Sequence, residues 1–353
     1  MSTFAESTQR HFWTFTPQQV RDTREATYVA GCAAARRDSV KGAAADEAEP
    51  TFAEAAWLQL HFEAKLLQFC DEVETSVAER VVSQSLDHEV IQVKHREHLR
   101  RRQRRVAHTA LVYFKRVCLR HSLLDPQHNP RLLVLASIYL AAKVEEEHAD
   151  VTLKQLCERS GVHTNDIVKA ELLVLESIDF HVSIFHGFRS LETLLGKLAE
   201  TLQWSNNLPD IKKYNRVRSA EYQSVLKAHP NVSAFLQRRA LELLKRCYFT
   251  DAVLIYSPSQ LAISCIMASV VRPGAAADVP EPSLISQLKD TELSAFIPGF
   301  FPRLLTTSFD QKVVGQCLRR LDTCMKDISK MLISKLPQQP KRAAWLLRRA
   351  NSS

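Results

Sequence analysis

The stretch that most constrains the fold of this chain begins at Asn129-Pro130. Asn is a preferred N-cap residue and proline is favoured at the first helical position, so this pair indicates the start of a helix. From Leu132 to Ala142 almost every residue is apolar, and the run ends at Lys143, shortly before Glu145–Glu147. A helix that is apolar on all sides must be buried, so we predict that it lies at the centre of a helical bundle.

Composition also favours an all-α fold. The chain of 353 residues is long enough for two domains, has only 8 glycines, and contains no sustained alternation of β-branched residues. No apolar run is as long as a bilayer requires, and the first residues do not form a signal-peptide pattern, so we expect a cytosolic or nuclear protein without a membrane partner. The net charge of +8 permits contacts with nucleic acid or acidic partners but does not require them.

The sequence predicts neither a metal site nor an active site. The 8 cysteines are scattered without a C-x-x-C pair, and most fall in apolar stretches, so we expect reduced and buried thiols. Cys317 and Cys324 share a helix face, which alone does not make a metal site, and His95 and His98 lie among basic residues that disfavour a bound cation. Motifs of serine hydrolases, P-loop enzymes, metalloproteases and kinases are absent from the sequence, so we expect no catalysis and no cofactor.

Helix starts are marked by capping boxes, in which a Ser or Thr is followed three residues later by Glu or Gln. The side chains of such a pair bond each other's backbone N–H groups, which leaves fewer unsatisfied donors at the helix start. The boxes are Thr16–Gln19, Thr51–Glu54, Thr152–Gln155 and Ser257–Gln260.

The layout of the first half recurs in the second. Each half has an amphipathic helix with a basic pair and a cysteine, then a loop, then a buried helix that starts with proline. We therefore predict two copies of one helical module. The expected organisation is an N-terminal helix and linker at 1–50, a first module at 51–203 with a basic insertion at about 74–105, a connection at 204–230, a second module with a closing helix at 231–336, and a basic tail at 337–353.

Motifs spread along the chain point to one protein family. They are QRHFWTF at 9–15, KLLQFC at 65–70, YFKR at 113–116, NPR at 129–131, AKVEE at 142–146 and FTDAVLIYSPSQLAI at 249–263. These segments resemble the cyclin family, and within it the cyclin H type. The resemblance covers roughly residues 9–335 and implies two tandem five-helix cyclin-box modules, flanked by N-terminal and C-terminal helices. The basic insertion and the connection at 204–230 look longer than in the family.

The resemblance implies a protein that has no chemistry of its own and activates a cyclin-dependent kinase by packing against it. Lys143 and Glu171 stand at the positions of the family's kinase-contacting pair, and charged groups at an interface fix register more than they add affinity. Val144 and residues of the helix from Phe185 would supply buried apolar area. From the residues alone, Lys143 is a lysine favoured by the helix dipole and Glu171 an exposed helix residue, and Glu145–Glu147 form a solvated edge rather than a metal cluster.

The partners that the resemblance implies are those of the CDK-activating kinase. They are the kinase catalytic subunit, a RING-finger assembly factor and the general transcription factor TFIIH, in which the kinase phosphorylates the C-terminal repeats of RNA polymerase II. The complex also phosphorylates the activation loops of other cyclin-dependent kinases, and we expect a nuclear location.

Two alternatives to this function stay open. One is another transcriptional cyclin, of the C, K or T type. The other is a DNA-binding transcription factor with a double module like that of TFIIB, although the sequence has no paired cysteines for a zinc ribbon.

A basic run also has several interpretations. It is a solvated helix face, a nuclear-import signal or, third, a direct nucleic-acid contact. Its arginines are Arg100, Arg101, Arg102, Arg104 and Arg105.

Overall fold

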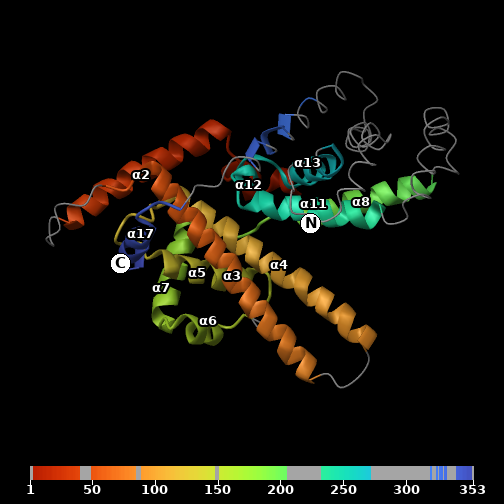
Figure 1. The fold of residues 1–353 in the computed structure, drawn as a ribbon, viewed down its shortest axis with the longest axis horizontal. Helices are drawn as coiled ribbons and strands as arrows, with labels where there is room; N and C mark the ends of the chain where they lie inside the picture. Colours follow the sequence, from red (N-terminus) through yellow and green to blue (C-terminus); the bar gives the residue numbers. More distant parts are fainter. Residues whose placement is uncertain are drawn as a thin grey trace. The chain divides into compact units, whose positions relative to one another are not determined.

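The computed structural model describes residues 3–39, 49–84, 89–147, 151–204, 232–271 and 339–351, with 319, 323–324, 326–328 and 330–331. Every regular element in these residues is helical, as predicted. The chain divides into two compact units, one of Met1–Ile184 with Lys335–Ser353 and the other of Phe185–Ser334 (Figure 1). The connection predicted at 204–230 and most of the predicted closing helix lie outside the described residues.

Unit 1 is a helical bundle with a short N-terminal entry and a helix from the C-terminal end of the chain. Its elements are η1 (Phe4–Glu6), α1 (Thr8–Phe12), α2 (Pro17–Ser39), α3 (Phe52–Gln84), α4 (Glu89–Arg120), α5 (Pro130–Val144), α6 (Leu153–Ser160), α7 (Thr164–Ser177) and α17 (Ala343–Asn351). The long helices α3 and α4 pack side by side, and their joined ends extend away from the rest of the unit (Figure 1). The basic stretch at about 74–105 falls on these two extended ends, so its described backbone is a helical arm rather than a loop.

Helix α5 is the centre of unit 1, as its apolar sequence predicts. It packs against α3, α4 and α7, and its residues from Leu133 to Ser137 are all buried. The Asn129 side chain caps its start by accepting hydrogen bonds from the backbone N–H groups of Arg131 (3.0 Å) and Leu132 (3.3 Å). Because α5 is covered on several sides, its apolar side chains supply much of the favourable burial in this unit.

The predicted capping boxes all form. In each box, the backbone N–H of the Ser or Thr donates to the side chain of the Glu or Gln three residues later. The backbone N–H of that Glu or Gln donates in return to the Ser or Thr hydroxyl. Helix α6 ends at Ser160 and is followed by the C-cap residue Gly161, whose φ of 69° is a left-handed conformation that favours glycine. Local sequence therefore sets most of the helix boundaries in the described residues.

The N-terminal entry is fixed to unit 1 by Trp13, which is almost fully buried. The Trp13 indole N–H donates a hydrogen bond to His181 Nδ1 (3.0 Å), and the guanidinium of the buried Arg116 lies 4.6 Å from the centre of the indole ring. Arg116 Nη1 donates to the backbone carbonyl of His181 (2.9 Å). Burial lowers the pKa of Arg116 to about 9, so its charge depends on these acceptors and on the indole face.

Unit 2 contains α8 (Gly187–Trp204), α11 (Val232–Tyr248), α12 (Ala252–Ile255) and α13 (Pro258–Val271). Helix α13 is buried between α8 and α11 and holds the place in this unit that α5 holds in unit 1. The start of α8 is tied to α11, because the Tyr248 hydroxyl accepts from the Gly187 backbone N–H (3.3 Å) and the Phe188 ring stacks on the Tyr248 ring. The described helices of unit 2 thus form a second module of the predicted kind.

The first module was expected to extend to residue 203, whereas the structure divides the chain after Ile184. The difference is helix α8, which the sequence analysis counted with the first module. Its packing partners are α11 and α13, so it belongs to the second unit. None of the helices in the described residues is long and apolar enough to cross a membrane.

Candidate functional site

Lys143 and Glu171, the two charged residues predicted to act together, form an ion pair. Lys143 lies in the last turn of α5, and Glu171 faces it from α7. Their side chains join through Lys143 Nζ and Glu171 Oε1, although the lysine side chain is 40% exposed and the glutamate side chain only 8%. The pair therefore places an inward carboxylate beneath a cation that still reaches solvent.

The ammonium of Lys143 has a second neighbour one turn earlier in α5. It lies 4.6 Å from the centre of the Tyr139 ring, within the range of a cation–π interaction. The C-terminal end of the helix dipole also favours a cation there. Three attractions therefore act on the Lys143 head group in the free chain.

The sequence analysis predicted that Glu145–Glu147 form a solvated edge, but only Glu146 is exposed. Glu147 is buried, and its Oε1 lies 4.0 Å from Arg105 Nη2, while Glu145 Oε2 lies 3.8 Å from Arg105 Nη1. Thr109 of α4 donates a hydrogen bond to Glu145 Oε1 (2.7 Å). The prediction was wrong for Glu145 and Glu147 because the chain turns back at Glu146, whose φ is 61°, and brings both carboxylates against α4.

The backbone of the predicted basic run belongs to α4, but among its arginines only the side chain of Arg105 is described. Arg105 is half exposed and bridges to Glu145 and Glu147, so it stabilises the end of α5. The side chains of Arg100, Arg101, Arg102 and Arg104 lie outside the described part of the structure.

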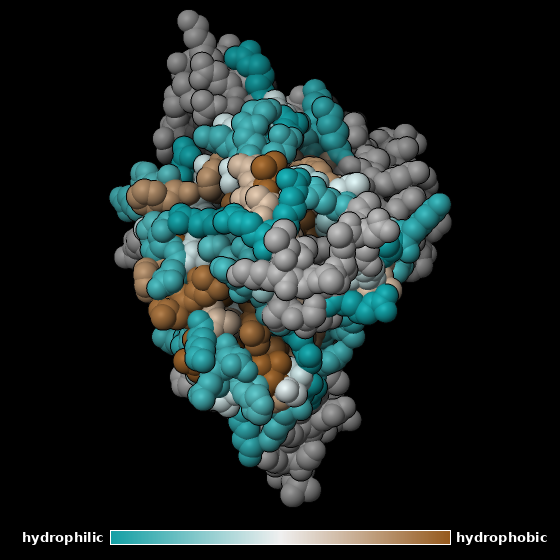
Figure 2. Space-filling model, turned by 90° about the vertical axis from the view of Figure 1, so that its left-hand side faces the viewer, coloured by the Kyte–Doolittle hydropathy of each residue, from teal (hydrophilic) through white to brown (hydrophobic). Residues whose placement is uncertain are grey.

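Two apolar side chains of α7, Val168 and Leu172, were missed by the sequence analysis, whereas Val144 was predicted. Val168 and Leu172, one turn apart on α7, are 45% and 54% exposed, and Val144 at the end of α5 is half-buried. The signal was present, because Ile167 and Val174 form the buried stripe of α7 and leave these two large residues off it. Figure 2 shows that brown apolar areas interrupt the hydrophilic surface on the face that it presents.

The structure assigns the fourth predicted residue, Phe185, to unit 2. It is half-buried at the entry to α8, whereas Lys143, Val144 and Glu171 belong to unit 1. Within the described residues, no group of His, Cys, Asp and Glu side chains is placed to hold a metal ion. The arrangement of the site fits recognition of a partner surface rather than the chemistry of a small substrate.

Comparison with known protein families gives two consecutive matches. The family described as Cyclin, N-terminal domain matches residues 73–183, and the family described as Cyclin C-terminal domain matches residues 186–277. Together they span more than half of the chain. The chain belongs to the cyclin family. The boundary between the two matches agrees with the division of the structure after Ile184, and the predicted family and all-α double-domain fold are confirmed.

Among similar sequences are both H-type and C-type cyclins. Cyclin-H1-1 of Arabidopsis thaliana is 29% identical over 158 residues (45% of this chain, 40% of the relative), and Cyclin-H of Xenopus laevis is 28% identical over 174 residues (47% and 45%). Cyclin-C1-1 of Arabidopsis thaliana is 29% identical over 184 residues (50% and 59%). The matches span about half the length of these curated relatives.

Two solved assemblies contain chains with this cyclin fold. A chain of the CAK complex from Chaetomium thermophilum, bound to ATP-gamma-S, matches with a TM-score of 0.60 and 18% identity, covering 99% of this cyclin and 88% of that chain. A chain of the yeast TFIIK complex (Kin28/Ccl1/Tfb3) matches with a TM-score of 0.50 and 14% identity, covering 93% and 100%. At these identities the likeness establishes the fold.

Proposed function

We propose that this cyclin is a non-catalytic, cyclin H-like regulatory subunit that binds and activates a cyclin-dependent kinase. One observation carries the proposal. The Lys143–Glu171 ion pair lies beside large apolar side chains of α7 that the described protein leaves exposed. Fixed charges next to uncovered apolar surface are what a specific protein interface uses for register and for affinity.

The apolar contribution to binding would come from Val168, Leu172 and Val144. Full burial of a fully exposed aliphatic side chain is worth about 1.5–3 kcal/mol. Val168 and Leu172 are 45% and 54% exposed, so covering each of them would contribute roughly half of that value. Phe185 and the helix that follows would add further apolar area on the second module.

The polar contribution would come from Lys143 and Glu171. In the free chain the lysine shields a carboxylate that is nearly buried, and an incoming kinase helix would share these groups through hydrogen bonds. The contacts of Lys143 with Glu171 and Tyr139 would lower the side-chain entropy that is lost on binding.

Activation would follow from selection of one kinase state. A protein kinase is active when a Glu of its regulatory helix pairs with its ATP-binding Lys, which requires that helix to swing inward. A cyclin that binds only the inward position shifts the population to the active state by its differential affinity. The cyclin needs no catalytic residue and no cofactor for this role.

The proposed partners are the kinase, a RING-finger assembly factor and TFIIH. The solved relatives come from a CAK complex and from TFIIK with Kin28, Ccl1 and Tfb3, which supports this assignment. The substrates would be activation loops of cyclin-dependent kinases and the C-terminal repeats of RNA polymerase II. The protein would act in the nucleus, with the run Arg100–Arg105 as an import signal.

The proposed interface is tested by binding to a purified kinase of the CDK-activating type. Leu172→Asp puts a charge on the exposed face of α7, and Val29→Asp makes the same kind of change at an exposed valine of α2. We expect Leu172→Asp to weaken binding at least tenfold, because an unpaired carboxylate would be desolvated at the interface, and Val29→Asp to leave binding within twofold. Equal affinities of the two variants for the kinase would show that α7 is not part of the interface.

A C-type transcriptional cyclin is the second candidate, because Cyclin-C1-1 of Arabidopsis thaliana matches half of this chain at 29% identity. The two candidates differ in the kinase that they select. Competition between a CDK-activating kinase and a kinase of the cyclin C type for a limiting amount of this chain distinguishes them, since the cognate kinase will be retained in excess.

A further inference from the structure

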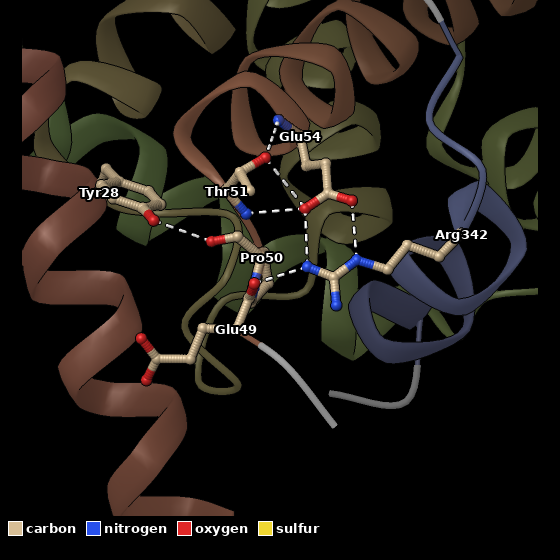
Figure 3. A network of polar contacts seen from close by, with 6 residues as sticks. All are labelled: Tyr28, Glu49, Pro50, Thr51, Glu54 and Arg342. Carbon is tan, nitrogen blue, oxygen red and sulfur yellow. Dashed lines mark hydrogen bonds and ion pairs between the residues drawn. The ribbon is translucent and has the colours of Figure 1, made fainter. Parts of the chain in front are cut away.

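The C-terminal end of the chain is tied to the start of α3 by Arg342. Its guanidinium donates to both carboxylate oxygens of Glu54, from Nε to Oε1 (2.7 Å) and from Nη2 to Oε2 (2.8 Å). Nη2 also donates to the backbone carbonyl of Glu49, as Figure 3 shows. The two partners of this bidentate ion pair are 288 positions apart in the sequence.

The helix that follows Arg342 packs on unit 1 by a narrow apolar face. Ala343, Leu346 and Ala350 of α17 are buried, and Leu346 and Ala350 border a small hollow with Leu58 of α3 and Leu124 of the loop before α5. Helix α17 also contacts α5 itself. We call residues 339–351, which comprise Arg342 and α17, the C-terminal strap.

Glu54 binds two groups at the start of α3. It closes the capping box of α3, accepting from the Thr51 backbone N–H (2.7 Å), and it receives Arg342. The hydrogen bonds from Arg342 are the main reason that the pKa of Glu54 falls to about 2.

Helix α2 contacts the residues just before α3. The Tyr28 hydroxyl of α2 donates to the Pro50 carbonyl (2.8 Å), and Arg36 of α2 pairs with Glu49. Three segments distant in sequence therefore meet at the start of α3 (Figure 3).

We propose that the C-terminal strap is a releasable element, latched to unit 1 by the Arg342–Glu54 ion pair. A helix of nine residues is unstable by itself, and the fully buried residues of α17 are one leucine and two alanines, with Trp345 and Leu347 half-buried beside them. The ion pair, whose Arg342 and Glu54 side chains are only 30% and 13% exposed, therefore supplies a large part of what keeps the strap docked. The strap opens at a lower free energy than the bundle beneath it.

Opening of the strap would loosen α5, which carries Lys143 at its other end. This consequence rests on the proposed function, in which Lys143 contacts the kinase. The strap would then couple the C-terminal end of the chain to kinase binding. The surface of unit 1 beneath the strap is occupied by this chain's own helix α17.

Hydrogen exchange of the full chain, read by mass spectrometry, tests the latch. Glu54→Gln retains the capping box, since Gln serves in such boxes, and removes only the charge that Arg342 binds. Arg342→Gln removes the other partner, and Lys341→Gln removes an exposed neighbouring cation as a control. We expect amides of α17 to exchange at least tenfold faster than in wild type in either latch variant. The double variant should exchange no faster than the single variants, and the Lys341→Gln control should stay within twofold of wild type.

Two outcomes would overturn the proposal. One is unchanged exchange of α17 in Glu54→Gln and Arg342→Gln. The other is an equal rise of exchange in α17, α4 and α5, which would mean that the strap does not open separately. The readout needs no kinase, so its failure is distinguishable from failure of the proposed function, which the Leu172→Asp binding measurement tests.

Discussion

Lys143 and Glu171 differ sharply in exposure although they form one ion pair, with side chains 40% and 8% exposed. The two partners should therefore not be equivalent in stability. Lys143→Ala leaves a nearly buried carboxylate without its cation, which costs roughly 2–4 kcal/mol. Glu171→Gln leaves a lysine that reaches water, which costs about 1 kcal/mol or less. Denaturant unfolding of the two variants measures the difference, and a larger loss for Glu171→Gln would contradict this view of the pair.

A second pair lies in the core between α3 and α4. Lys115 Nζ lies 2.7 Å from Glu63 Oε2, both side chains are buried, and Gln59 donates to the other carboxylate oxygen. Glu63→Ala should cost about 3–5 kcal/mol, because it leaves a buried ammonium uncompensated. The double variant Glu63→Leu with Lys115→Met should be much closer to wild type, since the replacement is apolar and similar in volume. A double-mutant cycle of unfolding free energies that proved additive would rule out this coupling.

The N-terminal entry should contribute to stability through Trp13 and not through its neighbour. Trp13 is 3% exposed and Phe12 is 60% exposed, so their truncation forms a matched pair of variants. Trp13→Ala should cost about 3–5 kcal/mol, because it opens a cavity and removes the ring that covers Arg116. Phe12→Ala should cost under about 1 kcal/mol. Equal midpoints of chemical unfolding for the two variants would show that the entry is not docked.

Glu54 gives a pH dependence with a definite sign. Its pKa is lowered from 4.5 to about 2 in the folded protein, chiefly by Arg342, so the folded state binds fewer protons than the unfolded state between these values. The stabilisation is complete above about pH 4.5 and is lost as the pH falls through about 2. The difference in unfolding free energy between wild type and Glu54→Gln should shrink over this range. A difference independent of pH would mean that Glu54 titrates normally.

What the sequence could predict here was local. The boxes at Thr51 and Ser257 and the cap at Asn129 depend on residues within a few positions, and the burial of α5 follows from its own apolar run. The family resemblance singled out Lys143 and Glu171 as candidate kinase contacts, but it did not predict that they form an ion pair with each other.

The features that the sequence analysis missed depend on packing between distant segments. Glu147 is buried against α4 because the chain turns back at Glu146, and α8 belongs to unit 2 because it packs on α11 and α13. The Arg342–Glu54 contact joins residues too far apart for any local pattern. The exposed Leu172 was visible in the helical spacing of α7, but only the surrounding structure shows that it is uncovered.

We propose that this cyclin activates its kinase through the end of α5 and the exposed face of α7. The most direct measurement is the rate at which a reconstituted CDK-activating kinase phosphorylates a peptide of RNA polymerase II C-terminal repeats. The wild-type chain should raise the rate strongly, and Lys143→Ala with Glu171→Ala should remove most of that gain while the variant stays helical by circular dichroism. Full activation by the double variant, or no activation by the wild-type chain, would contradict the account.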